Sequence, residues 1–248
     1  MCPEGGLCHR IRLALPGGPD AGQYGRASLS WLLTSLARRS IQSCSNNYSV
    51  KYAGGEALGQ FAHQRWHDHV DRVLLLEMPD AGPTPHSRVL GTLHGIQSVV
   101  PKLPEKCVLH RNSKRTEAGG YQVTRRVLPS LAPRLRLLFA APNDDSARGA
   151  IRAVRQAGRQ TFTAIMAQGW GPDELLEAEL RDTNSPLIGA VAHFPERYGS
   201  RIIPIILQFL NGQPVPPAPY TEHKLFLRDG FRLQDEEQTP TFENLKYA

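Results

Sequence analysis

The segment 137–158 joins an unbroken apolar stretch to an amphipathic helical pattern, and this junction constrains the fold more than any other part of the sequence. Residues 137–141 contain no polar side chain, which is typical of a strand that is covered on both faces in a parallel sheet. The polar run Asn143-Asp144-Asp145 follows where the strand ends and a helix begins. In open α/β sheets, ligands bind at that edge. The segment therefore predicts a strand–helix unit with polar side chains at a ligand-binding edge.

The helix predicted after this polar run has two distinct faces. Apolar residues share one face: Ala147, Ile151 and Val154. Arginines share the opposite face: Arg148, Arg152, Arg155 and Arg159. Asp144 and Asp145 can cap the helix by accepting its first N–H groups. Gly158 is expected to end it.

Apolar stretches and helical patterns alternate along most of the chain. Further strands are predicted at 73–76, 107–110, 161–167, 186–192 and 224–227. Further helices are predicted at 52–66, 88–100, 121–128, 173–180 and 198–210, and the segment 79–85, rich in Pro and Gly, is predicted as a loop. Residues 1–45 are harder to interpret, with a short strand at 11–15 and a helix at 28–41. The alternation predicts an α/β fold, a three-layer α/β/α lobe with a largely parallel sheet over about residues 46–192.

The composition narrows the function classes. The chain has 248 residues, a net charge of +6 and a pI near 9.3, which suits one large domain or two small ones. Lys and Arg are scattered among acidic residues, and the sequence contains no helix-turn-helix motif, so we predict no nucleic-acid partner. No apolar run is long enough to span a membrane, and residues 1–16 do not read as a secretory signal.

The chain carries no recognisable catalytic, cofactor or metal motif. A nucleophile elbow, a P-loop and a Gly-rich dinucleotide fingerprint are all missing, and no acid–base or nucleophile pair stands out. The four cysteines are irregularly spaced without a C-x-x-C pair. His63 and His67 lie one helical turn apart, as zinc ligands can, but no nearby Cys or carboxylate pair completes a site. We therefore predict no catalytic residue, no cofactor and no metal.

Residues 143–153 have the pattern Asn-Asp-Asp-x-Ala-x-Gly-Ala-x-x-Ala. This pattern resembles a segment of type I periplasmic binding proteins. These are the sugar-binding receptors of bacterial ABC importers, and they are related to the effector domains of lactose-repressor-like regulators. The resemblance extends over about residues 46–228. It includes Gly54-Gly55-Glu56-Ala57-Leu58-Gly59, the strand 73–77 with its following loop, and the hinge-like segment 192–199. Asn46-Asn47 departs from the usual Asp-Asn of the family.

The resemblance implies a set of residues on the ligand side of the C-terminal lobe: Asn143, Asp144, Asp145, Arg88, Gln168 and His193. Asn143 is the closest match to the asparagine that bonds sugar hydroxyls, and Arg88 to an arginine that bonds sugar oxygens. Gln168 stands where the family often has an Asp, and His193 precedes the Phe-Pro of the hinge. Simpler interpretations stay open: Arg88 as a surface helix residue and His193 as a strand-end histidine with ordinary partners.

Two aromatic residues near the same edge carry the same ambiguity. Trp170 and Phe194 can stack on the C–H face of a sugar. Core packing is the commoner fate of a phenylalanine such as Phe194.

The resemblance also implies an organisation of the chain. Residues 46–195 correspond to the ligand-binding C-terminal lobe, residues 196–228 to a segment that returns to the N-terminal lobe, and residues 229–248 to a polar tail. Residues 1–45 read as a poorly defined segment or a lobe remnant. The N-terminal lobe is therefore expected to be incomplete, and the isolated chain is expected to bind sugar weakly or not at all.

The function that this resemblance implies is non-enzymatic binding of a sugar or polyol. Its partners would be the membrane subunits of an ABC importer, and its location periplasmic, although no signal peptide is visible in the sequence. Two alternatives stay open. One is the effector-binding domain of a lactose-repressor-like regulator, which needs a DNA-binding segment, and the other is an enzyme on a Rossmann-like sheet.

Overall fold

A computed structural model describes residues 47–81, 83–169, 174–215 and 223–233 of the chain. The strand predicted at 11–15, the helix predicted at 28–41 and Trp170 lie outside these residues.

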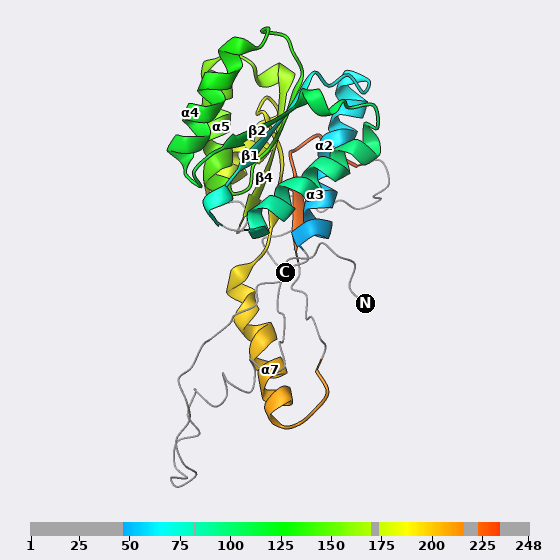
Figure 1. Cartoon of the computed structure of the whole chain (residues 1–248), viewed down its shortest axis with the longest axis vertical. Helices are drawn as coiled ribbons and strands as arrows, with labels where there is room; N and C mark the ends of the chain where they lie inside the picture. The colour runs from blue at the N-terminus through cyan, green and yellow to red at the C-terminus, as the bar shows by residue number, and fades with distance from the viewer. Residues whose placement is uncertain (1–46, 82, 170–173, 216–222, 234–248) are drawn as a thin grey trace.

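One six-stranded sheet forms the centre of the protein (Figure 1). Its strands are β1 (Arg72–Glu77), β2 (Val108–Asn112), β3 (Leu137–Ala140), β4 (Thr163–Gly169), β5 (Leu187–Ala192) and β6 (Lys224–Leu227). They lie in the order β2-β1-β3-β4-β5-β6, and all neighbours are parallel except β5 and β6. Every residue of β3, β4 and β5 is buried, as expected of strands covered on both faces.

Helices cover both faces of this sheet. The covering helices are α2 (Asn47–Trp66), α3 (Pro83–Val99), α4 (Glu117–Val127), α5 (Asp144–Gln156) and α6 (Glu174–Arg181), and a further helix, α7 (Tyr198–Leu210), follows β5 in the chain. In Figure 1, α2 and α3 lie on one side of the strands and α4 and α5 on the other. The predicted three-layer α/β/α lobe with a largely parallel sheet is confirmed.

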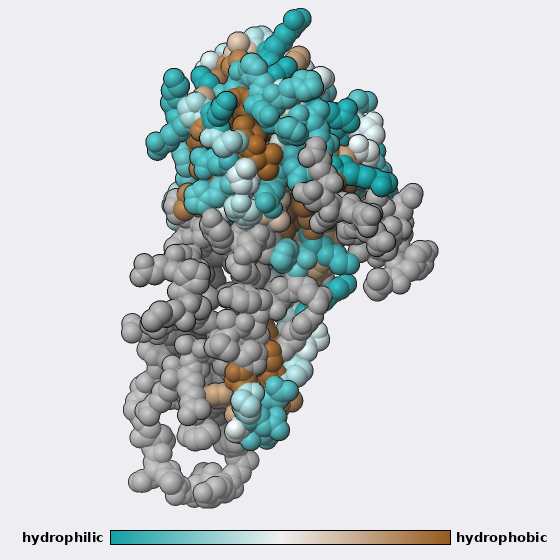
Figure 2. All heavy atoms as spheres, turned by 90° about the vertical axis from the view of Figure 1, so that its right-hand side faces the viewer, coloured by the Kyte–Doolittle hydropathy of each residue, from teal (hydrophilic) through white to brown (hydrophobic). Residues whose placement is uncertain are grey.

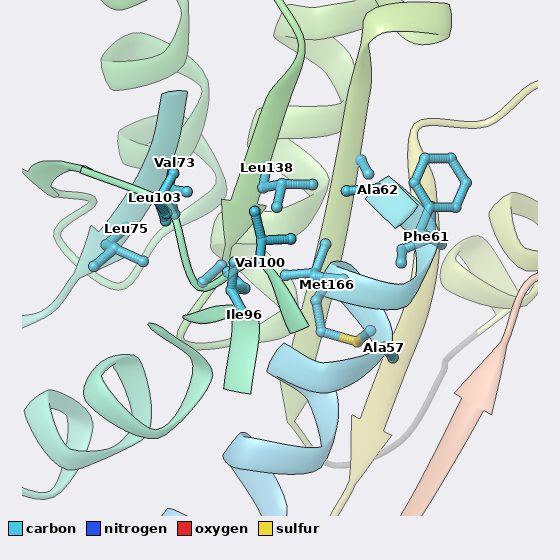
Figure 3. Close-up of a cluster of buried hydrophobic side chains, with 14 of the residues drawn as sticks. Ala57, Phe61, Ala62, Val73, Leu75, Ile96, Val100, Leu103, Leu138 and Met166 are labelled. Carbon is cyan, nitrogen blue, oxygen red and sulfur yellow. The ribbon is translucent and has the colours of Figure 1, made fainter. Parts of the chain in front are cut away.

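Alternate residues of the strands feed two separate hydrophobic cores. Towards α2 and α3, Val73 and Leu75 of β1 join a cluster that includes Phe61 and Ile96 (Figure 3). Towards α5 and α6, the intervening strand residues pack on apolar helix positions that include Ala147, Ile151, Val154, Leu176 and Leu180. The face predicted for α5 from Ala147, Ile151 and Val154 is thus confirmed as its buried face.

The helices α2 and α3 cross in backbone contact. A Cβ atom added at Gly95 would lie 2.1 Å from the carbonyl oxygen of Tyr52, and one added at Gly55 would lie 2.1 Å from that of Thr92. Only glycine fits at both positions, because any side chain would force the helices apart. This contact fixes how the residues at the start of each helix lie over the sheet.

Three local predictions are wrong. The helix α3 begins at Pro83 rather than at residue 88, because proline suits a first helical turn, where no N–H partner is needed. Asn143, and not Asp144 or Asp145, caps α5: its Oδ1 accepts from Ser146 N at 3.0 Å. Arg159 does not lie on the exposed face of α5. Gly158 ends that region with φ of +64°, and Arg159 beyond it is buried.

The helix α7 extends away from the sheet (Figure 1) and has the bounds that the sequence predicted. Its residues Ile203, Leu207 and Leu210 are exposed, and Figure 2 shows hydrophobic atoms on the surface in this region. None of the helices in the described part of the chain is long and apolar enough to cross a membrane.

Candidate ligand-binding site

Two buried polar side chains lie at the carboxyl ends of neighbouring strands. Gln168 is next to last in β4, and His193 follows β5, with its N–H bonded to the carbonyl oxygen of Gly169 at 3.0 Å. Gln168 pairs in register with Val191, so the alternation along β5 puts Gln168 and His193 on the same face of the sheet, towards α2 and α3. Gln168 is 1% exposed and His193 6%.

Gln168 is held by α3. Its Nε2 donates to Thr92 Oγ1 at 2.9 Å, and that hydroxyl donates to the carbonyl oxygen of Arg88 at 3.2 Å. Among the described residues, Gln168 Oε1 has no hydrogen-bond partner, although it is buried. A buried acceptor without a donor is costly, so this atom needs a water molecule or a ligand.

His193 is held by α2. The Nζ of Lys51, which is fully buried, lies 2.8 Å from His193 Nε2. Because an ammonium group only donates, Nε2 accepts when Lys51 is charged, and the ring proton then sits on Nδ1. Within the described part of the chain, Nδ1 is buried without a partner. When Lys51 is charged, this contact therefore makes Nδ1 the donor, on the same face of the sheet as the acceptor of Gln168.

Burial and neighbouring positive charges lower the pKa values of both His193 and Lys51. Burial, the charge of Lys51 and then those of Arg88 and His223 lower the pKa of His193 from 6.5 to about 2, so its ring is neutral at pH 7. Burial and then Arg88 also lower the pKa of Lys51 well below its usual value, while Asp144 acts in the opposite direction. Removing charged groups from water disfavours their charged forms.

Arg88 and Asp144 approach the same strand ends from two different helices. Arg88 of α3 is partly buried, and burial lowers its pKa while Tyr198 and Asp144 raise it. Asp144 is the first residue of α5, and a Cβ atom added at Gly169 would lie 2.0 Å from its Oδ2. The Asp144 carboxylate therefore packs directly on the end of β4.

Four of the six predicted site residues come together at this edge: Arg88, Asp144, Gln168 and His193. Asn143 uses its amide elsewhere: besides capping α5, its Nδ2 donates to the carbonyl oxygen of Arg115 at 2.9 Å. Asp145 is exposed and bonds Arg148 on its own helix. The ligand roles of Asn143 and Asp145 stay predictions, and their contacts in the structure belong to the start of α5.

Lys51 is the residue that sequence reasoning missed. It lies one position before the predicted helix 52–66 and has no motif around it. Lysine is among the residues least often buried without a charge partner, so the sequence gives no reason to place it at a ligand-binding edge. Its partner His193 is 142 positions away in the chain.

Phe194 packs against the core on the α5 side of the sheet. Its ring meets Phe226 at a centroid distance of 6.3 Å, and the guanidinium of Arg197 lies 4.7 Å from its centroid. Stacking of Phe194 on a sugar stays a prediction, as does that of Trp170. His63, which the sequence places one turn from His67, bonds Asp68, and the nearby His69 bonds Asp71.

Comparison with solved structures identifies the fold. A solute-binding protein from Actinobacillus succinogenes with bound D-allose matches at 17% identity and a TM-score of 0.58, over 73% of this chain and 58% of its own. A glucose-galactose binding protein from Geobacillus stearothermophilus matches at 17% identity and a TM-score of 0.59, over 80% of this chain and 66% of its own. A solute-binding protein from Agrobacterium vitis with bound alpha-D-tagatopyranose matches at 17% identity and a TM-score of 0.59, over 75% of this chain and 58% of its own. The chain shares the fold of these sugar-binding proteins.

The predicted likeness to type I periplasmic binding proteins is thus confirmed for the fold. The chain spans 58% to 66% of the length of these three structures. No family model matches the sequence, and no curated protein matches it significantly.

Proposed function

We propose that the chain is a non-enzymatic binding protein for a sugar or polyol. The observation that carries this proposal is the pair of buried atoms Gln168 Oε1 and His193 Nδ1, which face the same side of the sheet without partners in the described residues. A sugar hydroxyl both donates and accepts. It can therefore donate to the glutamine oxygen and accept from the imidazole N–H, which satisfies both atoms at once.

Charged groups at the same edge suit this ligand class. Arg88 can donate to ring or hydroxyl oxygens, and Asp144 can accept from hydroxyl groups. Lys51 acts through His193, because it holds the ring in the orientation and tautomer that present Nδ1–H. The solved structures that share the fold and carry D-allose, D-arabinose or tagatose in their descriptions support a monosaccharide-sized ligand.

The family likeness extends the proposal to partners and location. We propose the membrane subunits of an ABC importer as partners and an extracytoplasmic place of action, because the structural neighbours are described as ABC-transporter solute-binding proteins. The described site residues form one wall of a binding site. We therefore expect weak binding by this chain alone unless residues 1–46 add contacts.

Calorimetry on the full chain tests the proposal. The ligands are D-allose, D-tagatose, D-arabinose, D-galactose and a polyol. Gln168→Leu removes the acceptor and should weaken binding about 2- to 12-fold, which corresponds to one neutral hydrogen bond of about 0.5–1.5 kcal/mol. Gln122→Leu, on the exposed surface of α4, is the matched control and should bind as the natural chain does. Absence of saturable binding for every ligand, or equal binding by both variants, would contradict the proposal, as would turnover of the sugar.

A further inference from the structure

We propose that a second pocket, at the opposite end of the lobe, binds a small organic anion through Arg159 and Arg125. The pocket has a volume of about 390 Å³ and lies where α4 and α5 end. The sugar site lies at the start of α5. Because α5 has 13 residues, the two sites are separated by about 20 Å.

Arg159 is the residue that points to a ligand. Its side chain lines the pocket, and the residue is only 7% exposed. Its Nη2 donates to the carbonyl oxygen of Leu131 at 2.5 Å, whereas its Nη1 is buried without an acceptor among the described residues. A guanidinium stays charged even where burial lowers its pKa, as it does for Arg159. Because Nη1 has almost no accessible surface, an oxygen of a ligand would supply the missing acceptor once the guanidinium turns towards the pocket.

The other polar groups of the pocket also favour an anion. Arg125, in the last turn of α4, brings a second positive charge, and among the described residues no acidic side chain lines the pocket. The Oε1 of Gln156 already accepts from the hydroxyl of Tyr121 at 2.7 Å, which leaves its Nε2 as a donor. The ends of α4 and α5 carry about half a negative charge each, but two arginines outweigh them. The charged side chains of the described lining are therefore both cations.

The rest of the lining is apolar and sets the shape of the ligand. Leu128, Pro129, Pro133 and Ala153 form these walls. A free inorganic ion would leave them without a partner, whereas an oxyanion on a compact apolar body would fill the volume. Carboxylates and phosphate monoesters share this chemistry, because both present two or more oxygens to a guanidinium.

Binding experiments on the full chain can separate these sources. The probes are benzoate, phenyl phosphate, inorganic phosphate and the uncharged benzamide, titrated by NMR or calorimetry. We expect saturable one-to-one binding of benzoate or phenyl phosphate, and the stronger of the two identifies the preferred oxyanion. Benzamide and inorganic phosphate should bind at least about tenfold more weakly, since each lacks one half of the recognition.

Three variants locate the binding. Arg159→Gln should weaken it at least about tenfold, because a charge-assisted hydrogen bond is lost. Arg134→Gln, in an exposed stretch outside the pocket, should leave it unchanged. Since Arg159 is buried and its replacement can disturb folding, Ala157→Trp is the second test: it fills the pocket from an exposed position and keeps both arginines. The proposal is overturned if neither organic anion binds at about 10 mM, if benzamide binds equally well, or if Ala157→Trp binds as before.

Discussion

Replacing His193 with glutamine should make the stability of the protein less sensitive to acid. Burial of His193, followed by the charges of Lys51, Arg88 and His223, lowers the pKa of its ring from 6.5 to about 2. In the unfolded chain the ring takes up a proton below about pH 6.5, and in the folded chain it does not. Between these pKa values the unfolded state therefore binds more protons, and the free energy of unfolding falls as the pH falls.

The size of this effect follows from the two pKa values. Well below pH 6.5, one proton taken up only by the unfolded chain costs about 1.4 kcal/mol per pH unit. From pH 7 to pH 5 the loss from His193 alone is about 2 kcal/mol, less than two full pH units would give, because near pH 6.5–7 the ring is only partly protonated in the unfolded chain. This is a large part of the 5–15 kcal/mol that is typical of the stability of a domain.

Urea unfolding at pH 5, 6 and 7, followed by tryptophan fluorescence, measures the effect. Trp66 is a suitable probe, because it is 6% exposed and packs edge-on against Phe61. The natural chain should lose about 2 kcal/mol more than His193→Gln between pH 7 and pH 5. The surface variant His67→Gln controls for the loss of a histidine as such. Equal losses in the natural chain and in His193→Gln would refute the reasoning, since the buried ring would then not be held neutral.

Two further predictions concern glycines at close contacts. Gly169→Ala should displace the Asp144 carboxylate, because its Oδ2 would lie 2.0 Å from the new Cβ. Calorimetry should then show weaker sugar binding. Unchanged binding would exclude Asp144 from the site. Gly95→Ala should lower the free energy of unfolding by about 1–3 kcal/mol or more, because the new Cβ meets backbone of α2. The control Gly199→Ala, in α7 with nothing within 4 Å, should be neutral or stabilising by up to about 1 kcal/mol, and similar unfolding curves for the two variants would contradict the close crossing.

The fold could be predicted because its elements carry local signals. The strand β3 and the helix α7 have the predicted positions, since an unbroken apolar run and a 3.6-residue pattern each depend on neighbouring residues only. The start of α3 differs from the prediction because Pro83 and Pro85 are typical both of a loop and of a first helical turn. Arg159 differs from the prediction because the helical pattern does not continue past Gly158, whose positive φ redirects the chain.

The site could be predicted only in part. Polar residues at the carboxyl ends of parallel strands meet at one edge, which is why Gln168 and His193, predicted from the family resemblance, lie on one face there, while their ligand roles stay predictions. Asn143 also stands at a strand end, but in the structure its amide serves as the helix cap and bonds Arg115. The burial of Lys51 depends on how α2 crosses α3, and a single sequence does not encode this contact in any local pattern.

The crossing of α2 and α3 links the core to the site. Lys51 lies one helical turn before Gly55, and Thr92 lies three residues before Gly95. The close approach at the two glycines therefore determines how far Lys51 and Thr92 lie from the strand ends. Any separation of the helices would move Lys51 away from His193 and Thr92 away from Gln168, and both bonds would weaken together. Burying Lys51 beside a neutral imidazole costs stability, and the apolar core beneath the crossing offsets that cost. We therefore expect the small residues at the crossing to affect the proposed sugar binding without touching a ligand, through the positions of Gln168 and His193.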